Sequence, residues 1–485
     1  MSLTTTPDTT PHTTTPDTTT TPDVSNKLDP GVFKLAMTLL VGVIPVTLDS
    51  TITNIALHTL SVDLHASLTT VQWVTTAYLL AMAVAIPVTG WLETRFGGKL
   101  VWLVALAAFL LGSIGSATAV SMASLITWRT VQGAAAGIIL PIMTTILMRA
   151  ARGQHLGKLM AVLGLPALVV PMLGPALGGA ILAGASWRWL FWINVPLCLA
   201  AIAAAVRLLP ATERHPGEMP DLLGLTLAGV GTAAVLFGFA QAGSLGSLLR
   251  LAVLLPLLAG ALLLVTFIWW TRRAPRPVID LHLFRIGSFA AACVTVVLVG
   301  FSVNSGTMLL PLFMQQIQGS TVLVAGMIML AQGVGSLATR TLAGNLTDKI
   351  GARWVVVAGT VVAALATIPF ALFGDATPWW ILVISLFVRG AGLSGLLIPA
   401  MSVAYKDVPA EKIASSTIIT RTIQQVGGAF GVAAVAVAVS WFSSRLSLGD
   451  AYHAAFWIVF AFTALTCLSA FRLPTASGTK SPSDH

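Results

Sequence analysis

A single acidic residue, Asp49, lies well inside the first long apolar stretch of the chain, in the segment LDSTITNIAL at residues 48–57. A helix predicted to begin near residue 33 would carry it about 24 Å along its axis. An ionised carboxylate in such surroundings is costly unless it is paired or hydrated. The position suits a group that binds and releases protons. The alternative is a structural Asp that is protonated or bonded to a Thr hydroxyl.

A basic residue occupies another apolar stretch. Arg129 opens the segment RTVQGAAAG at residues 129–137, and Gln132 shares its helix face. Because Arg keeps its charge, it must face the protein interior, where Gln132 can hydrogen-bond its partner. Arg129 either tunes a proton-binding group electrostatically or satisfies backbone carbonyls and helix packing. Gly133 and Gly137 form a GxxxG pattern that is typical of close helix packing.

A third segment combines prolines with glycines, in the sequence GLPALVVPMLGPALGG at residues 164–179. Each proline removes a helix hydrogen bond, and the glycines permit close backbone contact. The segment is either a bendable helix that controls opening or an ordinary kinked helix. Its C-terminal part contains Gly174, Pro175, Gly178 and Gly179.

Two loops share the pattern G-x-L-x-x-[RK]-x-G, at residues 90–99 and 344–353. Turn glycines are combined there with charges at a helix end. These charges latch neighbouring helix ends in one conformation, or they only anchor the loops on the cytoplasmic side. The candidate gating residues are Gly90, Arg95, Gly97, Asp348, Lys349 and Arg353, with Lys99 beside them.

Polar, aromatic or soft side chains within the apolar stretches are candidates to line a substrate cavity, although each alone is more typical of packing. These candidates are Asn54, Trp73, Tyr78, Gln132, Asn304, Met308, Gln315 and Gln332. Arg421, near the inner end of its stretch, is expected to extend to the membrane interface.

The composition shows which elements must position these residues. Of 485 residues, 56% are hydrophobic and 9% are charged, whereas soluble proteins carry about 25% charged residues. The chain is therefore expected to be an all-α polytopic membrane protein. Fourteen apolar runs are long enough to cross a bilayer. They lie at 33–57, 71–92, 100–120, 123–148, 158–183, 189–209, 222–242, 249–270, 288–313, 322–343, 353–373, 378–404, 415–440 and 452–472.

The charges predict the orientation. The net charge of +9 fits basic cytoplasmic loops better than nucleic-acid binding, and the Lys/Arg bias places both termini in the cytoplasm. Of the 17 acidic residues, all except Asp49 are assigned to tails, loops or span ends. The repeated loop pattern, together with Arg129 and its counterpart Arg389, indicates two related six-helix halves.

The domain prediction follows from this repeat. Residues 1–28 form a disordered Thr/Pro-rich cytoplasmic tail, and 29–210 form the N-terminal six-helix bundle. Residues 211–275 form a two-helix insert and linker, 276–474 the C-terminal six-helix bundle, and 475–485 a second cytoplasmic tail.

Several activities lack their sequence patterns. The chain contains no phosphate-binding G-x-x-x-x-G-K-[ST], H-E-x-x-H or G-x-S-x-G segment, so neither an ATP motor nor a common hydrolase is expected. Gly390, Gly392 and Gly395 match G-x-G-x-x-G inside an apolar run, where helix packing is the better interpretation. The three cysteines have no metal-ligand spacing. We expect no cofactor and no metal.

These segments together resemble the major facilitator superfamily, specifically its fourteen-span drug:proton antiporters. LDSTITNIAL is similar to the span 1 motif of that family and VQWVTTAYLLAMAVAIPVTGWL (71–92) to its span 2. RTVQGAAAG is similar to its span 4 motif, and GPALGG with WRWLFWINVP (187–196) to its span 5–6 region. GPALGG resembles the antiporter motif of exporters. The resemblance covers nearly the whole chain after the tail.

The resemblance implies two six-helix bundles plus two extra helices, alternating access, and export driven by the proton gradient. It implies that Asp49 is the proton acceptor and Arg129 its modulator, that Gly174, Pro175, Gly178 and Gly179 shape the antiporter helix, and that Gly90, Arg95 and Gly97 form the first gating loop. The first loop departs from the family pattern, because Thr94 stands where an acid is usual and Glu93 precedes it.

The expected function is therefore export of hydrophobic or amphipathic small molecules, such as antibiotics, from the cytoplasm across a bacterial inner membrane. We expect a monomer that binds substrate, protons and lipid. Neutral, zwitterionic or singly charged compounds are expected rather than dications, because the C-terminal spans carry no interior acid. A dedicated exporter of one natural product, lipid or siderophore is the alternative. A membrane enzyme or a non-transporting scaffold fits less well, because the interior offers one acid and no histidine.

Overall fold

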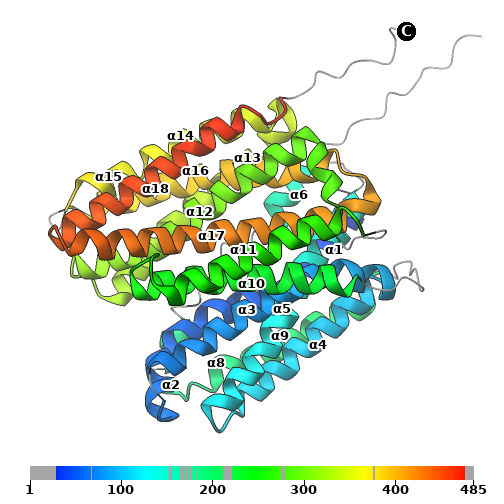
Figure 1. The fold of residues 1–485 in the computed structure, drawn as a ribbon, viewed down its shortest axis with the longest axis horizontal. Coiled ribbons are helices and arrows are strands. Elements are labelled where there is room, and N and C mark those ends of the chain that lie inside the picture. The colour runs from blue at the N-terminus through cyan, green and yellow to red at the C-terminus, as the bar shows by residue number, and fades with distance from the viewer. Residues whose placement is uncertain are drawn as a thin grey trace, which may run out of the picture.

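The computed structural model describes residues 29–475, with gaps at 67, 152–155, 164–169, 171–173, 175–176, 183, 211–220, 275–278 and 375–376. Within these residues the protein is helical and has no strand (Figure 1). The predicted tail at 1–28 and residues 476–485 of the predicted tail at 475–485 lie outside the described residues.

One group of helices corresponds to the first half of the chain. Its elements are α1 (Pro30–Ile52), η1 (Thr53–Ala56), α2 (Leu57–Asp63), α3 (Leu68–Phe96), α4 (Gly98–Ala117), α5 (Met122–Ala151), α6 (Leu156–Leu163), α8 (Trp189–Trp192) and α9 (Asn194–Leu208). A helix pair follows, α10 (Leu222–Leu245) and α11 (Leu251–Thr271).

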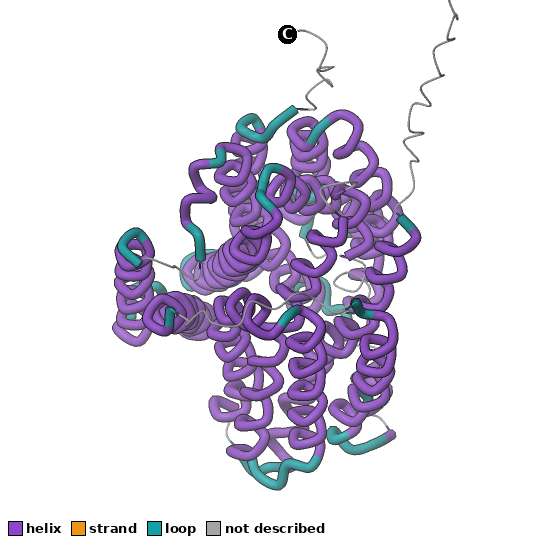
Figure 2. The backbone as a smooth tube through the Cα atoms, turned by 90° about the vertical axis from the view of Figure 1, so that its right-hand side faces the viewer, coloured by secondary structure: helices purple, strands orange, loops and turns teal. Residues whose placement is uncertain are grey.

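The second group of helices comes from the rest of the chain. Its elements are η2 (Leu281–Arg285), α12 (Gly287–Gln316), α13 (Val322–Ile350), α14 (Ala352–Leu365), α15 (Ile368–Leu372), α16 (Trp379–Lys406), η3 (Ala410–Lys412), α17 (Ile413–Ser443) and α18 (Leu448–Ala470). Seen from the end in Figure 2, the two groups lie one above the other, with a helix pair beside their junction.

Twelve helices in the described part of the chain are long and apolar enough to cross a membrane. They match twelve of the fourteen expected spans. The expected span at 322–343 corresponds to α13, a 29-residue helix that packs along α16. The remaining span, at 158–183, lies only partly within the described residues. The all-α membrane architecture is confirmed, and the count of fourteen stays a prediction.

The helix pair α10 and α11 is joined to the rest of the molecule mainly through α10. This helix packs against α3 of the first group and α17 of the second, and α11 packs against α10 (Figure 1). The Asp221 carboxylate, which caps the N-terminus of α10, also accepts a 2.9 Å hydrogen bond from Trp270 Nε1 of α11. The insert thus lies across the seam between the two halves.

The internal repeat is visible in equivalent contacts. Gly133 on α5 faces the backbone of α3, and Gly390 on α16 faces the backbone of α13 in the same way. Gly97 and Gly351, which separate α3 from α4 and α13 from α14, have φ angles of +83° and +86° that favour glycine. The helix-packing interpretation of Gly390 is confirmed.

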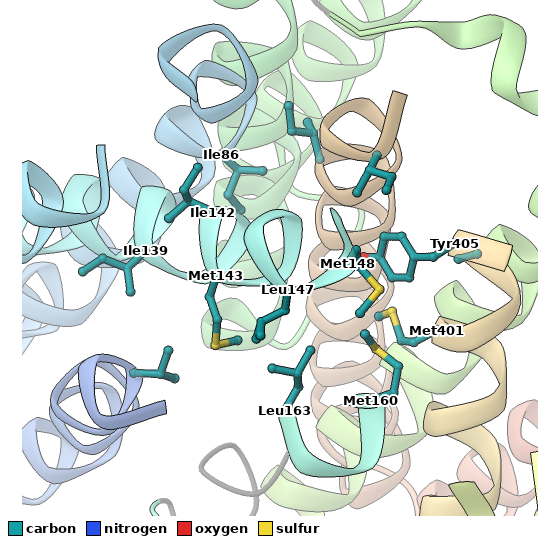
Figure 3. Close-up of a cluster of buried hydrophobic side chains, with 14 of the residues drawn as sticks. Ile86, Ile139, Ile142, Met143, Leu147, Met148, Met160, Leu163, Met401 and Tyr405 are labelled. Carbon is teal, nitrogen blue, oxygen red and sulfur yellow. The ribbon is translucent and has the colours of Figure 1, made fainter. Parts of the chain in front are cut away.

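The two halves share one hydrophobic cluster at the end of the bundle where Gly97 and Gly351 lie. We call this end the basic end and the shared contacts the basic-end cluster. The cluster joins side chains of α3, α5 and α6 to side chains of α16 (Figure 3). Those drawn and labelled are Ile86, Ile139, Ile142, Met143, Leu147, Met148, Met160, Leu163, Met401 and Tyr405.

At the opposite end of the bundle, the described residues form a separate cluster in each half. One contains Leu48 and Trp187 of the first half, and the other contains Phe313 and Tyr452 of the second. The two groups of helices diverge toward this end in Figure 1. The structure therefore shows a conformation in which the halves are joined at the basic end.

Candidate functional site

Asp49 on α1 is completely buried and forms an ion pair with Arg129 of α5, whose side chain is 1% exposed. The pair joins Asp49 Oδ2 to Arg129 Nη1. Thr53 Oγ1 donates to the backbone carbonyl of Asp49 at 2.8 Å, not to its carboxylate. A structural Asp held by a Thr hydroxyl is therefore not what the structure contains. The carboxyl group instead pairs with a buried guanidinium.

The second oxygen of the carboxylate is held by two amide groups. Asn194 Nδ2, at the start of α9, lies 3.1 Å from Asp49 Oδ1, and Gln132 Nε2 lies 3.4 Å from it. Gln132 Oε1 accepts hydrogen bonds from Arg129 Nη1 at 3.1 Å and from Ser116 Oγ at 3.0 Å. The carboxylate thus receives three donors from two other helices.

Asn194 is a site residue that sequence reasoning missed. Its Nδ2 also donates to Ser113 Oγ of α4 at 3.0 Å, and Ser113 Oγ donates to the carbonyl of Phe191 at 2.9 Å. Its Oδ1 is buried and has no hydrogen-bond partner among the described residues. The available signal was a polar amide at the head of an apolar run, but its distance in sequence from Asp49 concealed the contact.

Aromatic rings complete the surroundings of Arg129. The guanidinium carbon lies 4.4 Å from the ring centre of Tyr78 and 5.7 Å from that of Phe191. Arg129 Nε donates to the carbonyl of Val74 at 3.3 Å. Arg129 therefore makes the contacts that both interpretations require: it pairs with the Asp49 carboxylate, and it donates to a backbone carbonyl. Tyr78, expected in a substrate cavity, is instead buried against this cation.

The second half contains a buried arginine at the equivalent place, without an equivalent acid. Arg389 on α16 donates from Nη1 to Gln332 Oε1 at 2.7 Å and from Nη2 to the carbonyl of Ser302 at 2.9 Å. No ion pair with Arg389 occurs among the described residues. Gln332, expected in a substrate cavity, therefore belongs to this network. The second half therefore retains a buried arginine, but the partners of Arg389 are an amide oxygen and a backbone carbonyl, whereas Arg129 pairs with a carboxylate.

Glu93 lies at the end of a span, as assigned, but the sequence did not predict that its side chain is buried. Glu93 lies inside α3 and is 2% exposed. Arg149, in the last turn of α5, places Nη1 2.7 Å from Glu93 Oε1. Among the described residues, neither carboxylate oxygen accepts a hydrogen bond. The apolar pattern concealed this acid because it lies only one turn from the end of its helix.

The repeated loops hold helix ends within each half. Lys99 Nζ donates to the carbonyls of Val206 and Leu209 at the C-terminus of α9, at 2.9 and 2.7 Å. Arg353 Nε donates in the same manner to the carbonyl of Leu473 after α18, at 2.9 Å. These cations lie where the helix dipole is negative. In the described contacts, each of these two cations therefore caps a helix of its own half and does not connect one half to the other.

The other loop residues have different neighbours. The Arg95 guanidinium carbon lies 5.8 Å from the ring centre of Trp91 and 5.7 Å from that of Phe96. Asp348 and Lys349 lie in the last turn of α13. A side chain added at Gly90 would meet Ile418 of α17, so Gly90 lies where α3 approaches the other half.

The predicted antiporter segment is only partly described. Gly174 is buried, and a Cβ added there would collide with Thr51 of α1, two residues from Asp49. Gly178 is buried, and Gly179 is exposed, with no atom of the described residues within 4 Å of an added Cβ. Pro175 lies outside the described residues.

Two adjacent cavities lie between the halves and share Gln425 as a lining residue. The larger, about 250 Å³, is bounded by α3, α10, α12 and α17 and has Thr76 and Asn304 on its wall. The smaller, about 100 Å³, is bounded by α3, α5 and α17 and contains Arg421 and Gln424. The insert helix α10 is thus a wall of the larger cavity.

Of the residues expected to line a substrate cavity, Asn304 lines the larger cavity. Trp73 instead stacks on Phe237 of α10, with ring centres 5.8 Å apart. Met308 packs on an apolar cluster of the second half, and Gln315 lies on α12 away from the lining of both cavities. The side chain of Asn54 lies outside the described residues. The expectation that Arg421 extends to the membrane interface is wrong, because it lines the smaller cavity.

The comparisons with known proteins agree with this architecture. The family model described as Major Facilitator Superfamily matches residues 39–309 and 292–485, and the chain belongs to this family. The solved structure of the proton:xylose symporter XylE aligns with a TM-score of 0.63 and 16% identity, over 92% of this chain and 96% of that chain. The likeness to XylE shows the fold alone.

Two relatives of known sequence are named as drug-resistance proteins. The Multidrug resistance protein B homolog of Mycobacterium tuberculosis is 31% identical over 421 residues, covering 86% of this chain and 78% of that protein. The Lincomycin resistance protein LmrB of Bacillus subtilis is 28% identical, over 80% of this chain and 81% of that protein. The chain is a multi-pass membrane transporter, not an enzyme.

Proposed function

We propose that the protein exports hydrophobic or amphipathic small molecules from the bacterial cytoplasm in exchange for protons, with Asp49 as the proton-binding group. The observation that carries the proposal is the completely buried ion pair of Asp49 and Arg129. The names of the relatives, a multidrug and a lincomycin resistance protein, support drugs as substrates. The proton gradient then supplies the energy, and no cofactor is needed.

The local geometry supports a proton-dependent switch. Protonation of Asp49 would remove the charge that offsets Arg129, while Asn194 and Gln132 would lose a charged acceptor. A buried arginine without its carboxylate is unfavourable, so α1, α5 and α9 would favour another arrangement. Gly174 of the antiporter segment approaches α1 beside this site, which would couple that segment to the same switch.

The basic-end cluster supports alternating access. It closes the seam between the halves at the end where positive loops are expected to face the cytoplasm. In the proposed cycle, this conformation takes up a proton from outside and releases substrate there. Proton release to the cytoplasm follows once the basic end opens, and new substrate then binds.

The test is export by purified protein in vesicles with an imposed pH gradient. Wild type should accumulate substrates against their gradient, and Asp49→Asn should lose at least nine-tenths of this activity, because the amide cannot bind the proton. Asp63→Asn, which alters an exposed acid at the end of α2, should retain it. Equal uphill transport by wild type and Asp49→Asn would show that Asp49 is not the proton carrier.

Toxicity panels in an efflux-deficient bacterium would define the substrates. Protection by wild type and not by Asp49→Asn against several unrelated compounds supports a broad exporter. Protection against one compound supports a dedicated exporter. Vesicles that bind compounds and never move them would contradict transport itself.

A further inference from the structure

The smaller cavity contains one charged side chain in an otherwise apolar and amide-lined space. Arg421 reaches it from α17, beside Gln424 and Gln425, and the opposite wall is made by Leu140 and Pro141 of α5. No acidic residue is among the residues that line either of the two cavities. The residues that line these two cavities therefore have a net positive charge, in mostly apolar surroundings.

The hydrogen-bonding capacity of Arg421 is only partly used. Its Nη2 donates to Thr144 Oγ1 of α5 at 3.2 Å, and its buried Nε has no hydrogen-bond partner in the part of the chain that the structure describes. No ion pair with Arg421 occurs among the described residues. A guanidinium offers a planar fork of donors that matches a carboxylate. An acid entering the cavity would satisfy donors that the protein leaves open.

We propose that Arg421 is the recognition group of a subsite for the acidic group of the substrate, so that the preferred substrates are amphipathic compounds with one carboxylate. This inference rests on the proposed function and narrows its substrate class. The apolar body of the compound lies along Met82, Ile86 and Leu140, and it extends past Gln425 into the larger cavity toward Phe239 and Asn304. Cations are disfavoured there because no acid offsets Arg421.

A purely structural role makes a different prediction. If Arg421 only ties α17 to α5 through Thr144, removal of the Thr144 hydroxyl should reproduce the effect of removing the guanidinium. If Arg421 recognises an acid, Thr144→Ala should leave the preference for the acid intact. Thr144→Ala is therefore the matched control variant.

The experiment measures binding to purified full-length protein in nanodiscs of phosphatidylcholine, so that its result does not depend on proton coupling. The probes are dansylglycine and its methyl ester, which share a fluorophore and differ in the carboxylate. Wild type should bind the acid about tenfold or more tightly than the ester, the difference expected for a charge-assisted hydrogen bond. Arg421→Gln should bind both equally, with the Kd of the ester unchanged within about twofold.

The remaining variants and outcomes complete the test. Arg421→Lys should keep part of the preference, because the charge remains and the planar fork is lost. Wild type that binds neither probe, or binds both equally, overturns the subsite. So does loss of the preference in Thr144→Ala. Loss of selective binding when phosphatidylglycerol is added would assign Arg421 to a lipid headgroup and also overturn it.

Failure of the subsite and failure of the proposed function give different results. Equal binding of the two probes together with Asp49-dependent uphill export would remove the acid subsite and leave the exporter. Selective binding of the acid without any uphill export would leave the subsite and contradict proton-coupled transport.

Discussion

Asn194 Nδ2, at the head of α9, donates a 3.1 Å hydrogen bond to the carboxylate of Asp49 on α1. The two residues are 145 positions apart in the chain, and both are completely buried. The contact makes α9 part of the same charged network as α1 and α5. A change in the charge of Asp49 would therefore alter the contacts among α1, α5 and α9 of the first half.

Removal of this amide should uncouple transport. Asn194→Leu removes a donor to Asp49 and leaves the ion pair with Arg129, so we expect uphill export to fall about tenfold, as for loss of a hydrogen bond to a charge. Energy-independent substrate exchange should persist. Vesicle assays with and without a pH gradient measure the two activities. Equal losses of both would instead show a general packing defect.

The buried ion pair should show strong coupling in a double-mutant cycle. Arg129→Gln and Asp49→Asn each leave a buried charge unpaired, and we expect each to lower the free energy of unfolding by about 3–5 kcal/mol. The double variant should recover at least half of that loss without recovering uphill transport. Thermal unfolding of the purified variants in one detergent gives the comparison. Simple additivity of the two losses would contradict direct pairing.

Two glycines of one segment should respond differently to the same methyl group. Gly174→Ala forces a Cβ against Thr51 of α1, so we expect export to fall severalfold and stability by about 1–3 kcal/mol. Gly179→Ala meets no atom within 4 Å and should leave folding and stability unchanged. Export rates and melting temperatures of both variants check this. A larger effect at Gly179 would place the critical contact elsewhere in the segment.

A wedge at the basic end should shift the conformational equilibrium. Gly90→Leu places a side chain where α3 meets Ile418 of α17, which would separate the halves at the basic end. We expect slower export and faster alkylation of a cysteine introduced at Met401, in the basic-end cluster. Gly287→Leu, at a position with no atom within 4 Å, is the control. Unchanged alkylation in Gly90→Leu would mean that this contact does not hold the closed conformation.

The apolar runs and the isolated acid could be recognised in the sequence because each depends on local residue type. Twenty apolar residues predict a span whatever lies beside it, and a lone carboxylate such as Asp49 is conspicuous in such a run. The repeated loops were recognisable for the same reason, since Gly97 and Gly351 are needed where the backbone takes a positive φ angle.

The partners of these residues depend on packing between helices that are remote in the chain. Tyr78, Gln332 and Trp73 were plausible cavity residues because polar and aromatic side chains within spans can face a cavity or a neighbouring helix. The rotation of each helix about its axis decides between these, and packing against other helices sets that rotation. Arg421 was misjudged for this reason, because a position near the end of a span does not reveal which side the side chain faces.

The sequence by itself thus determined the class of protein, the twelve spans that the described helices match, the internal repeat and the isolated acid Asp49, since composition, periodicity and local backbone geometry carry that information. Only the tertiary structure decided that Asp49 is paired with Arg129 and Asn194, that Glu93 is buried beside Arg149, and that Arg421 faces the cavity between the halves. These contacts and cavities form between residues on different helices, so they exist only after the helices have packed against one another.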